Sequence, residues 1–147
     1  MAEGDGAIFN NFKEQVMEEF FNLANGADTV MLSLHVAEAP DIDSDTQYSD
    51  VVGTEYAAAS GYSTKGATLA GQDTTQDDAN DRGKFDGTDV TWSSLGPLDT
   101  ATPSDAIMWD ETAAGDELMC YWELGTTATN GGDYTLAFGA TGIILLT

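Results

Sequence analysis

The chain has 147 residues, of which 26 are acidic and 4 are basic, so its formal net charge is −22 at pH 7. Binding to nucleic acid or to an anionic membrane uses clustered Lys and Arg, so this charge excludes a nucleic-acid partner and disfavours an anionic membrane surface; we predict neither partner. The length favours one domain over residues 1–147, and a chain of this size can bury a core without disulfides or a structural metal.

The acidity is of a particular kind, because 17 of the 26 acidic residues are Asp and only three residues are Lys. Such a charge destabilises a compact chain by self-repulsion at low salt, and high salt screens that repulsion. The composition is typical of proteins from halophiles that accumulate salt. We therefore expect stability to rise steeply with salt concentration.

The first predicted element is an amphipathic helix over residues 7–24. An apolar stripe repeats with helical spacing and consists of Phe9, Phe12, Val16, Phe20 and Leu23. Met17 lies at the edge of the stripe, and Phe21 lies close to the polar face. Either a neighbouring loop covers these two side chains, or they contact another subunit.

From residue 28 onward the hydrophobic period changes from 3.6 to 2, which indicates strands. Residues 30–36 alternate so that one face is buried and His35 lies on the other face, while residues 118–124 and 134–138 alternate in the same way. The apolar residues 143–146 suit a buried final strand. We therefore predict a mainly β chain, with an antiparallel β-sandwich or jelly roll over residues 28–147 after one N-terminal helix. The predicted core consists of Phe9, Phe12, Val16, Phe20, Leu32, Leu34, Trp122, Leu136, Phe138 and Leu145.

One acidic loop has the residue spacing of a calcium site. Asp41, Asp43 and Asp45 occupy the first, third and fifth places of an EF-hand loop, but Thr46 and Val52 stand where that loop needs Gly and Glu. We expect a solvated loop here, and we predict no metal and no cofactor for the chain.

Catalysis has weak candidates, because His35 is the one imidazole and Cys120 the one thiol. A nucleophile needs an adjacent base. We expect His35 to be exposed or at an interface and Cys120 to be a small core residue. The three tryptophans are expected in the core or at an interface. The sequence therefore predicts no catalytic residues and no enzyme.

Several short motifs resemble those of small virion structural proteins of tailed phages, which include head decoration, cement and head-fibre proteins. The motifs are the run from Gly61 to Leu69, the segments Asp89–Trp92 and Ala106–Trp109, and the apolar end after Gly142. In the usual run a glycine stands where this chain has Lys65. The resemblance implies a non-enzymatic protein that binds the major capsid protein on the capsid exterior, as a homotrimer at three-fold positions. With the halophilic composition, it points to a haloarchaeal tailed virus.

A second function is considered alongside decoration. In a tail-fibre or receptor-binding module, Tyr48, Tyr56 and Tyr62 would bind glycans from exposed loops. In either case we predict that Met17 and Phe21 contact another subunit, because apolar side chains gain by burial in an interface.

Overall fold

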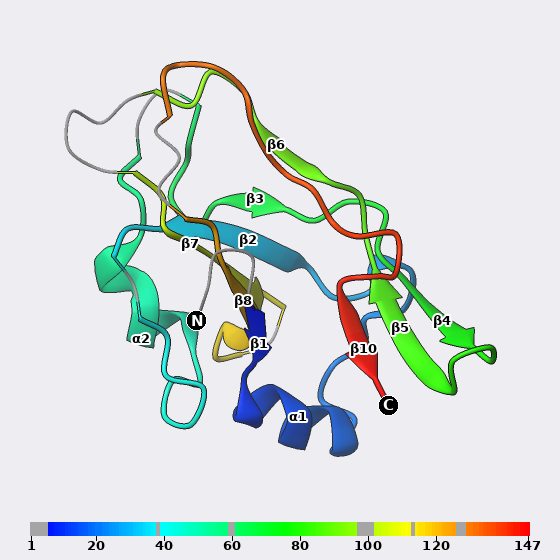
Figure 1. Cartoon of the computed structure of the whole chain (residues 1–147). Helices are drawn as coiled ribbons and strands as arrows, with labels where there is room; N and C mark the ends of the chain where they lie inside the picture. The colour runs from blue at the N-terminus through cyan, green and yellow to red at the C-terminus, as the bar shows by residue number, and fades with distance from the viewer. Residues whose placement is uncertain (1–5, 38, 59–60, 97–101, 113, 126–128) are drawn as a thin grey trace.

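The computed structural model describes residues 6–37, 39–58, 61–96, 102–112, 114–125 and 129–147 (Figure 1). The expected mainly β class with antiparallel sheets is confirmed. The strands are β1 (Gly6–Ile8), β2 (Val30–His35), β3 (Ala67–Thr68), β4 (Asp73–Asp77), β5 (Arg82–Asp86), β6 (Val90–Trp92), β7 (Asp105–Asp110), β8 (Glu117–Glu123), β9 (Tyr134–Leu136) and β10 (Ile144–Leu146). The α-helices are α1 (Asn10–Met17) and α2 (Tyr48–Val51), and two 3₁₀ turns are η1 (Ala24–Gly26) and η2 (Val52–Thr54).

The largest sheet has five antiparallel strands in the order β1-β8-β7-β2-β3. Its central strands β2 and β7 are buried at every position. Sequence alternation predicted one buried face for β2, and this was wrong for a physical reason. Residues 48–54 contact the second face, where Tyr48 stacks on Trp109 and Thr54 Oγ1 lies 3.1 Å from His35 Nδ1, while residues 54–56 pair with the edge of β2.

Two smaller sheets complete the structure: a three-stranded sheet in the order β10-β5-β4, and the pair β6-β9. Strand β4 reads Asp-Thr-Thr-Gln-Asp and is almost wholly exposed. The polar, acidic composition of residues 71–83 is typical of a long exposed loop, but β4 and β5 pair along their full length. An edge strand tolerates polar side chains on both faces.

The N-terminal helix predicted over residues 7–24 was wrong in its bounds. Residues 6–8 instead form β1 on the edge of the main sheet, and Phe9 donates its N–H to the Met119 carbonyl. The helix ends at Met17, and the chain reverses through Glu19, whose φ of 59° is left-handed. The residues after this turn no longer follow the helical stripe, and Phe21 rather than Phe20 packs inward.

The predicted core is correct in its centre and wrong at one position. Phe9, Phe12, Leu32 and Leu34 are fully buried, whereas Phe20 is 46% exposed. Four others are partly buried and pack on the core: Val16, Trp122, Leu136 and Phe138. In β10 the buried residue is Ile144, and Leu145 is half-buried.

Candidate functional site

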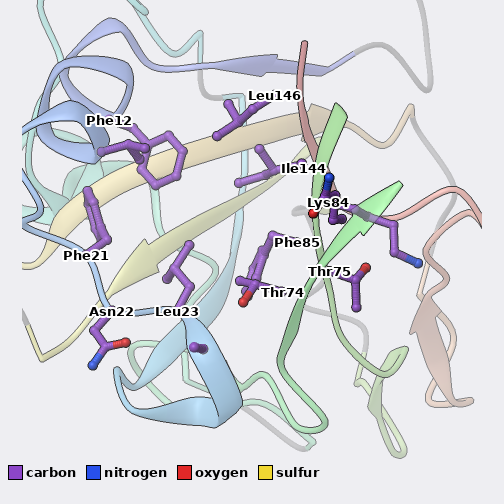
Figure 2. Close-up of a pocket in the computed structure, with 14 residues that line it drawn as sticks. Phe12, Phe21, Asn22, Leu23, Thr74, Thr75, Lys84, Phe85, Ile144 and Leu146 are labelled. Atoms are coloured by element: carbon purple, nitrogen blue, oxygen red, sulfur yellow. The ribbon is translucent and has the colours of Figure 1, made fainter. Parts of the chain in front are cut away.

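An apolar groove of about 440 Å³ lies between α1, the chain that follows it, and the sheet β10-β5-β4. Figure 2 shows Phe12, Phe21, Leu23, Phe85, Ile144 and Leu146 around one space. Its walls thus come from three parts of the sequence: residues 12–24, 74–85 and 144–146. We call this site the groove.

Strand register explains why this sheet face is apolar at one side and open at its centre. Ile144 pairs with Phe85, and Leu146 pairs with Gly83, so these four residues share a face. A Cβ atom built on Gly83 would meet no atom within 4 Å, and the backbone there is not left-handed. The missing side chain at Gly83 therefore leaves space at the floor of the groove.

Three large exposed apolar side chains lie on, or next in sequence to, the segments that form the groove, and we call these three residues the rim. Met17 is 80% exposed, Phe20 is 46% exposed, and Leu146 is 44% exposed. Met17 follows the groove-lining Val16, and the Phe20 ring lies 5.6 Å from that of Phe21. An exposed Phe and Met of this kind are more typical of an interface than of a solvent-facing surface.

The two predicted interface residues occupy different places around this groove. Met17 is 80% exposed, so no neighbouring loop of the described residues covers it, and its contact with another subunit stays a prediction. Phe21 is half-buried, lines the groove, and packs its ring 4.8 Å from that of Phe12. The predicted position of Phe21 close to the polar face of a helix was wrong, because the helix ends at Met17, and its contact with another subunit stays a prediction.

One end of the groove is acidic. A second hollow shares Gln76, Gly83 and Leu146 with the groove and is also lined by Asp78, Asp81 and Arg82. Arg82 is paired with Asp77 at 2.8 Å. Asp78 and Asp81 are exposed, and within the described chain no Lys or Arg lies in salt-bridge range of either carboxylate. We call these two residues the acidic end.

His35 is buried, which contradicts the expectation of an exposed or interface side chain. Its Nε2 atom lies 2.8 Å from Ser33 Oγ, and its Nδ1 atom lies 3.1 Å from Thr54 Oγ1. Burial lowers the pKa of His35 to about 4, although a hydrogen bond with the Val51 backbone acts in the opposite direction. The neutral imidazole is therefore a satisfied core group with no path to a substrate.

Cys120 is buried as predicted and packs with its thiol 4.0 Å from the Met108 sulfur. Desolvation raises the pKa of the thiol, so the thiolate does not form at neutral pH. Neither His35 nor Cys120 is placed to act as a nucleophile or base on a ligand in the groove.

The Asp41–Asp45 loop uses its carboxylates to hold its own turn. Asp43 donates its N–H to Asp41 Oδ1 at 2.9 Å, Asp41 donates its N–H to Asp45 Oδ2 at 2.8 Å, and Asn10 donates to Asp43 Oδ1 at 2.6 Å. The Asp43 N–H is the main cause that lowers the pKa of Asp41. Among the described residues, no three His, Cys, Asp or Glu side chains form a group that could hold a metal ion.

The aromatic residues of the glycan hypothesis are buried. Tyr48, Tyr56 and Tyr62 each have at most 5% of their surface exposed, so they cannot form a glycan platform. Tyr48 stacks on the buried Trp109 at 4.4 Å, and the Tyr62 hydroxyl donates to Glu55. Trp92 is also buried, as expected for a core residue.

In the described parts of the chain, no helix has both the length and the hydropathy needed to cross a membrane. No family model matches the sequence, and no curated protein or solved structure matches the chain.

Proposed function

We propose that the protein is a non-enzymatic virion structural protein that binds the outer surface of an icosahedral capsid and stabilises it. The observation that supports this function best is the exposed apolar rim of Met17, Phe20 and Leu146 beside the groove. A protein with a net charge of −22 has ample polar surface, and such a concentration of apolar area is typical of a surface that binds another protein.

The acidic surface and the apolar rim have separate parts in this proposal. In brine the Debye length falls to about 3 Å at 1 M salt, so long-range charge attraction contributes little to binding. Apolar burial is not screened in this way, and strongly hydrated salts reinforce it. An apolar attachment surface on an acidic body therefore suits a virion in brine.

Stabilisation would follow from mass action. A protein that binds the assembled capsid more tightly than its dissociated subunits shifts the equilibrium towards the assembled state. The proposed partner is the major capsid protein, with a homotrimer of this chain at three-fold positions and a sandwich-like arrangement of the sheets. The sandwich-like arrangement comes from the strand pattern of the sequence, and the partner and the homotrimer come from the sequence resemblance. The assignment to a haloarchaeal tailed virus comes from that resemblance together with the acidic composition.

Copy number in the virion tests the proposal. Purified particles of the virus that encodes the chain are digested, and the chain is quantified by mass spectrometry against the major capsid protein with isotope-labelled peptides. Decoration predicts on the order of hundreds of copies per particle, because a shell repeats its lattice sites by symmetry. A few dozen copies or fewer would point to a tail component, and absence from the particle would overturn the proposal.

A further inference from the structure

We propose that the groove binds a protein segment in which large apolar side chains lie next to Lys or Arg. This inference rests on the proposed function in that it assigns the partner chemistry of the same surface. The apolar part of the segment would lie between α1 and the sheet, and its basic part would lie at Asp78 and Asp81.

The dimensions and chemistry of the groove determine the apolar part. A volume of about 440 Å³ accommodates a few large side chains, and Phe12, Phe21, Leu23, Phe85 and Ile144 line it. Gly83 leaves the floor open, and the exposed rim residues extend the apolar area around the opening. Burying such side chains from a partner is the main source of binding free energy that this surface offers.

Charge complementarity determines the basic part. The groove continues past Leu146 to the acidic end, where Arg82 is already paired with Asp77. The carboxylates of Asp78 and Asp81 are left for a partner. A cation in direct contact with them keeps part of its attraction in 1 M salt, because a contact pair is separated by about one Debye length.

The same charges argue against a second copy of the chain as occupant. Each copy carries a net charge of −22, and the four basic side chains are few. Lys65, Arg82 and Lys84 are already paired with carboxylates of their own chain. A copy placed at the acidic end would bring mostly like charge, whereas an apolar and basic segment brings the opposite charge.

A peptide-display selection with the full chain tests this inference without any capsid. A library of random 12-residue peptides is selected against the immobilised protein in 0.15 M and in 2 M KCl, and enriched peptides are synthesised for affinity measurement. We expect enriched sequences in which two or more large apolar residues lie next to Lys or Arg, on either side. Selection of apolar peptides with no basic residues, or no enrichment at all, would overturn the inference.

Gly83→Val is the decisive variant, because its methyl groups would occupy the open floor while valine suits a strand. Gly132→Val is the matched control, since Gly132 is also exposed, with open space and no left-handed φ. Gly83→Val should weaken peptide affinity about tenfold or more at an unchanged or higher melting temperature. Equal peptide affinity for the two variants would place the binding site elsewhere.

The acidic end has its own control, because a basic peptide is attracted to any strongly acidic protein. The double variant Asp78→Asn/Asp81→Asn should lower the affinity for the peptide about tenfold in 0.15 M KCl. The control double variant Asp89→Asn/Asp133→Asn removes the same amount of charge on the β6-β9 side, and it should change the peptide affinity little. Equal losses of peptide affinity in the two double variants would show non-specific attraction and overturn the basic part of the inference.

Concentration-dependent dimerisation that Gly83→Val abolishes would identify a second copy as occupant and overturn the whole inference.

The capsid proposal and the groove proposal can fail separately. Peptide binding that depends on Gly83 would stand even if the chain is absent from virions. Equally, hundreds of copies per virion would stand even if the groove selects no peptide, and attachment would then use another surface.

Discussion

The Phe21 ring packs at a tilt of 54° against the Phe12 ring, with the ring centroids 4.8 Å apart. Phe12 is fully buried on α1, whereas Phe21 follows the turn that ends the helix. The contact fixes the segment after the helix against α1 and so forms one wall of the groove. The exposed neighbour Phe20 is left at the rim.

This arrangement predicts opposite results for two adjacent substitutions. Phe21→Ser should lower the free energy of unfolding by about 1–2 kcal/mol, because it removes a half-buried ring from the Phe12 contact. Phe20→Ser should leave stability nearly unchanged and weaken attachment to capsids or to groove peptides. Urea unfolding and binding assays on both variants check this. A larger stability loss for Phe20→Ser would show that the two side chains are placed the other way round.

Lys65 and Gly66 form a left-handed pair, with φ values of 73° and 84°. A Cβ atom on Gly66 would lie 1.8 Å from the Leu32 carbonyl oxygen, so Gly66→Ala should destabilise the fold strongly, by more than about 2 kcal/mol. Lys65 tolerates the strained conformation while its ammonium contacts Glu111 at 3.1 Å, Asp116 at 3.2 Å and the Trp109 ring at 5.0 Å.

Substitutions of Lys65 separate strain from contacts. Lys65→Ala should cost about 1 kcal/mol, because it removes partly exposed ion pairs and a cation–π contact but keeps the strain. Lys65→Gly removes the same contacts and relieves roughly 1 kcal/mol of left-handed strain, so it should be more stable than Lys65→Ala. Thermal unfolding of Gly66→Ala, Lys65→Ala and Lys65→Gly provides the ranking. A melting temperature of Lys65→Gly below that of Lys65→Ala would contradict it.

The strands could be predicted from sequence where alternation is strong, as in residues 30–36 and 118–124, which match β2 and β8 to within one residue at each end. The end of α1 could not be predicted, because no Gly or Pro follows Met17 closely to signal the end of a helix. The chain turns instead at Glu19, in a left-handed conformation that is unfavourable for residues other than Gly. Strand β4 was missed because its polar residues gain their order from pairing with β5. Tertiary contacts decided both cases.

The candidate site was predictable only in fragments. Met17 and Phe21 were identified as unusual apolar residues, and both lie at or beside the groove. The groove itself combines α1 with strands β4, β5 and β10. These segments are far apart in the sequence, and no local sequence pattern indicates that they lie together. The burial of His35 likewise depends on α2 and η2, which contact the second face of the sheet through Tyr48 on Trp109 and Thr54 on His35.

His35 should make stability depend on pH in mildly acidic solution. Its pKa is lowered from 6.5 to about 4 in the folded chain, so the unfolded chain binds the proton first as pH falls. The stabilisation is complete above pH 6.5 and is lost progressively as pH falls to about 4, by up to about 3 kcal/mol. Below that range, Asp41, Asp50 and Asp77, whose pKa values are lowered by hydrogen bonds, extend the loss.

NMR titration of the His35 ring protons measures this pKa directly in the folded protein. A midpoint near 4 is expected, together with a free energy of unfolding that declines between pH 6.5 and 4. His35→Asn should remove that decline and keep the loss at lower pH from the carboxylates. A midpoint near 6.5 would show that the imidazole is hydrated and that its burial has been misassigned.

Salt should raise the melting temperature more strongly than in an ordinary acidic protein. At 0.01 M salt the Debye length is about 30 Å, so the excess charges repel one another across the whole molecule, whereas at 1 M it is about 3 Å. In the described residues only three basic side chains form ion pairs. Screening by salt therefore weakens many repulsions between carboxylates and few attractions between opposite charges. Thermal unfolding in 0.01–3 M KCl measures the effect, and sucrose series at both salt extremes separate screening from solute exclusion. Equal melting temperatures in low and molar salt would contradict the halophilic assignment and the explanation of the net charge that depends on it.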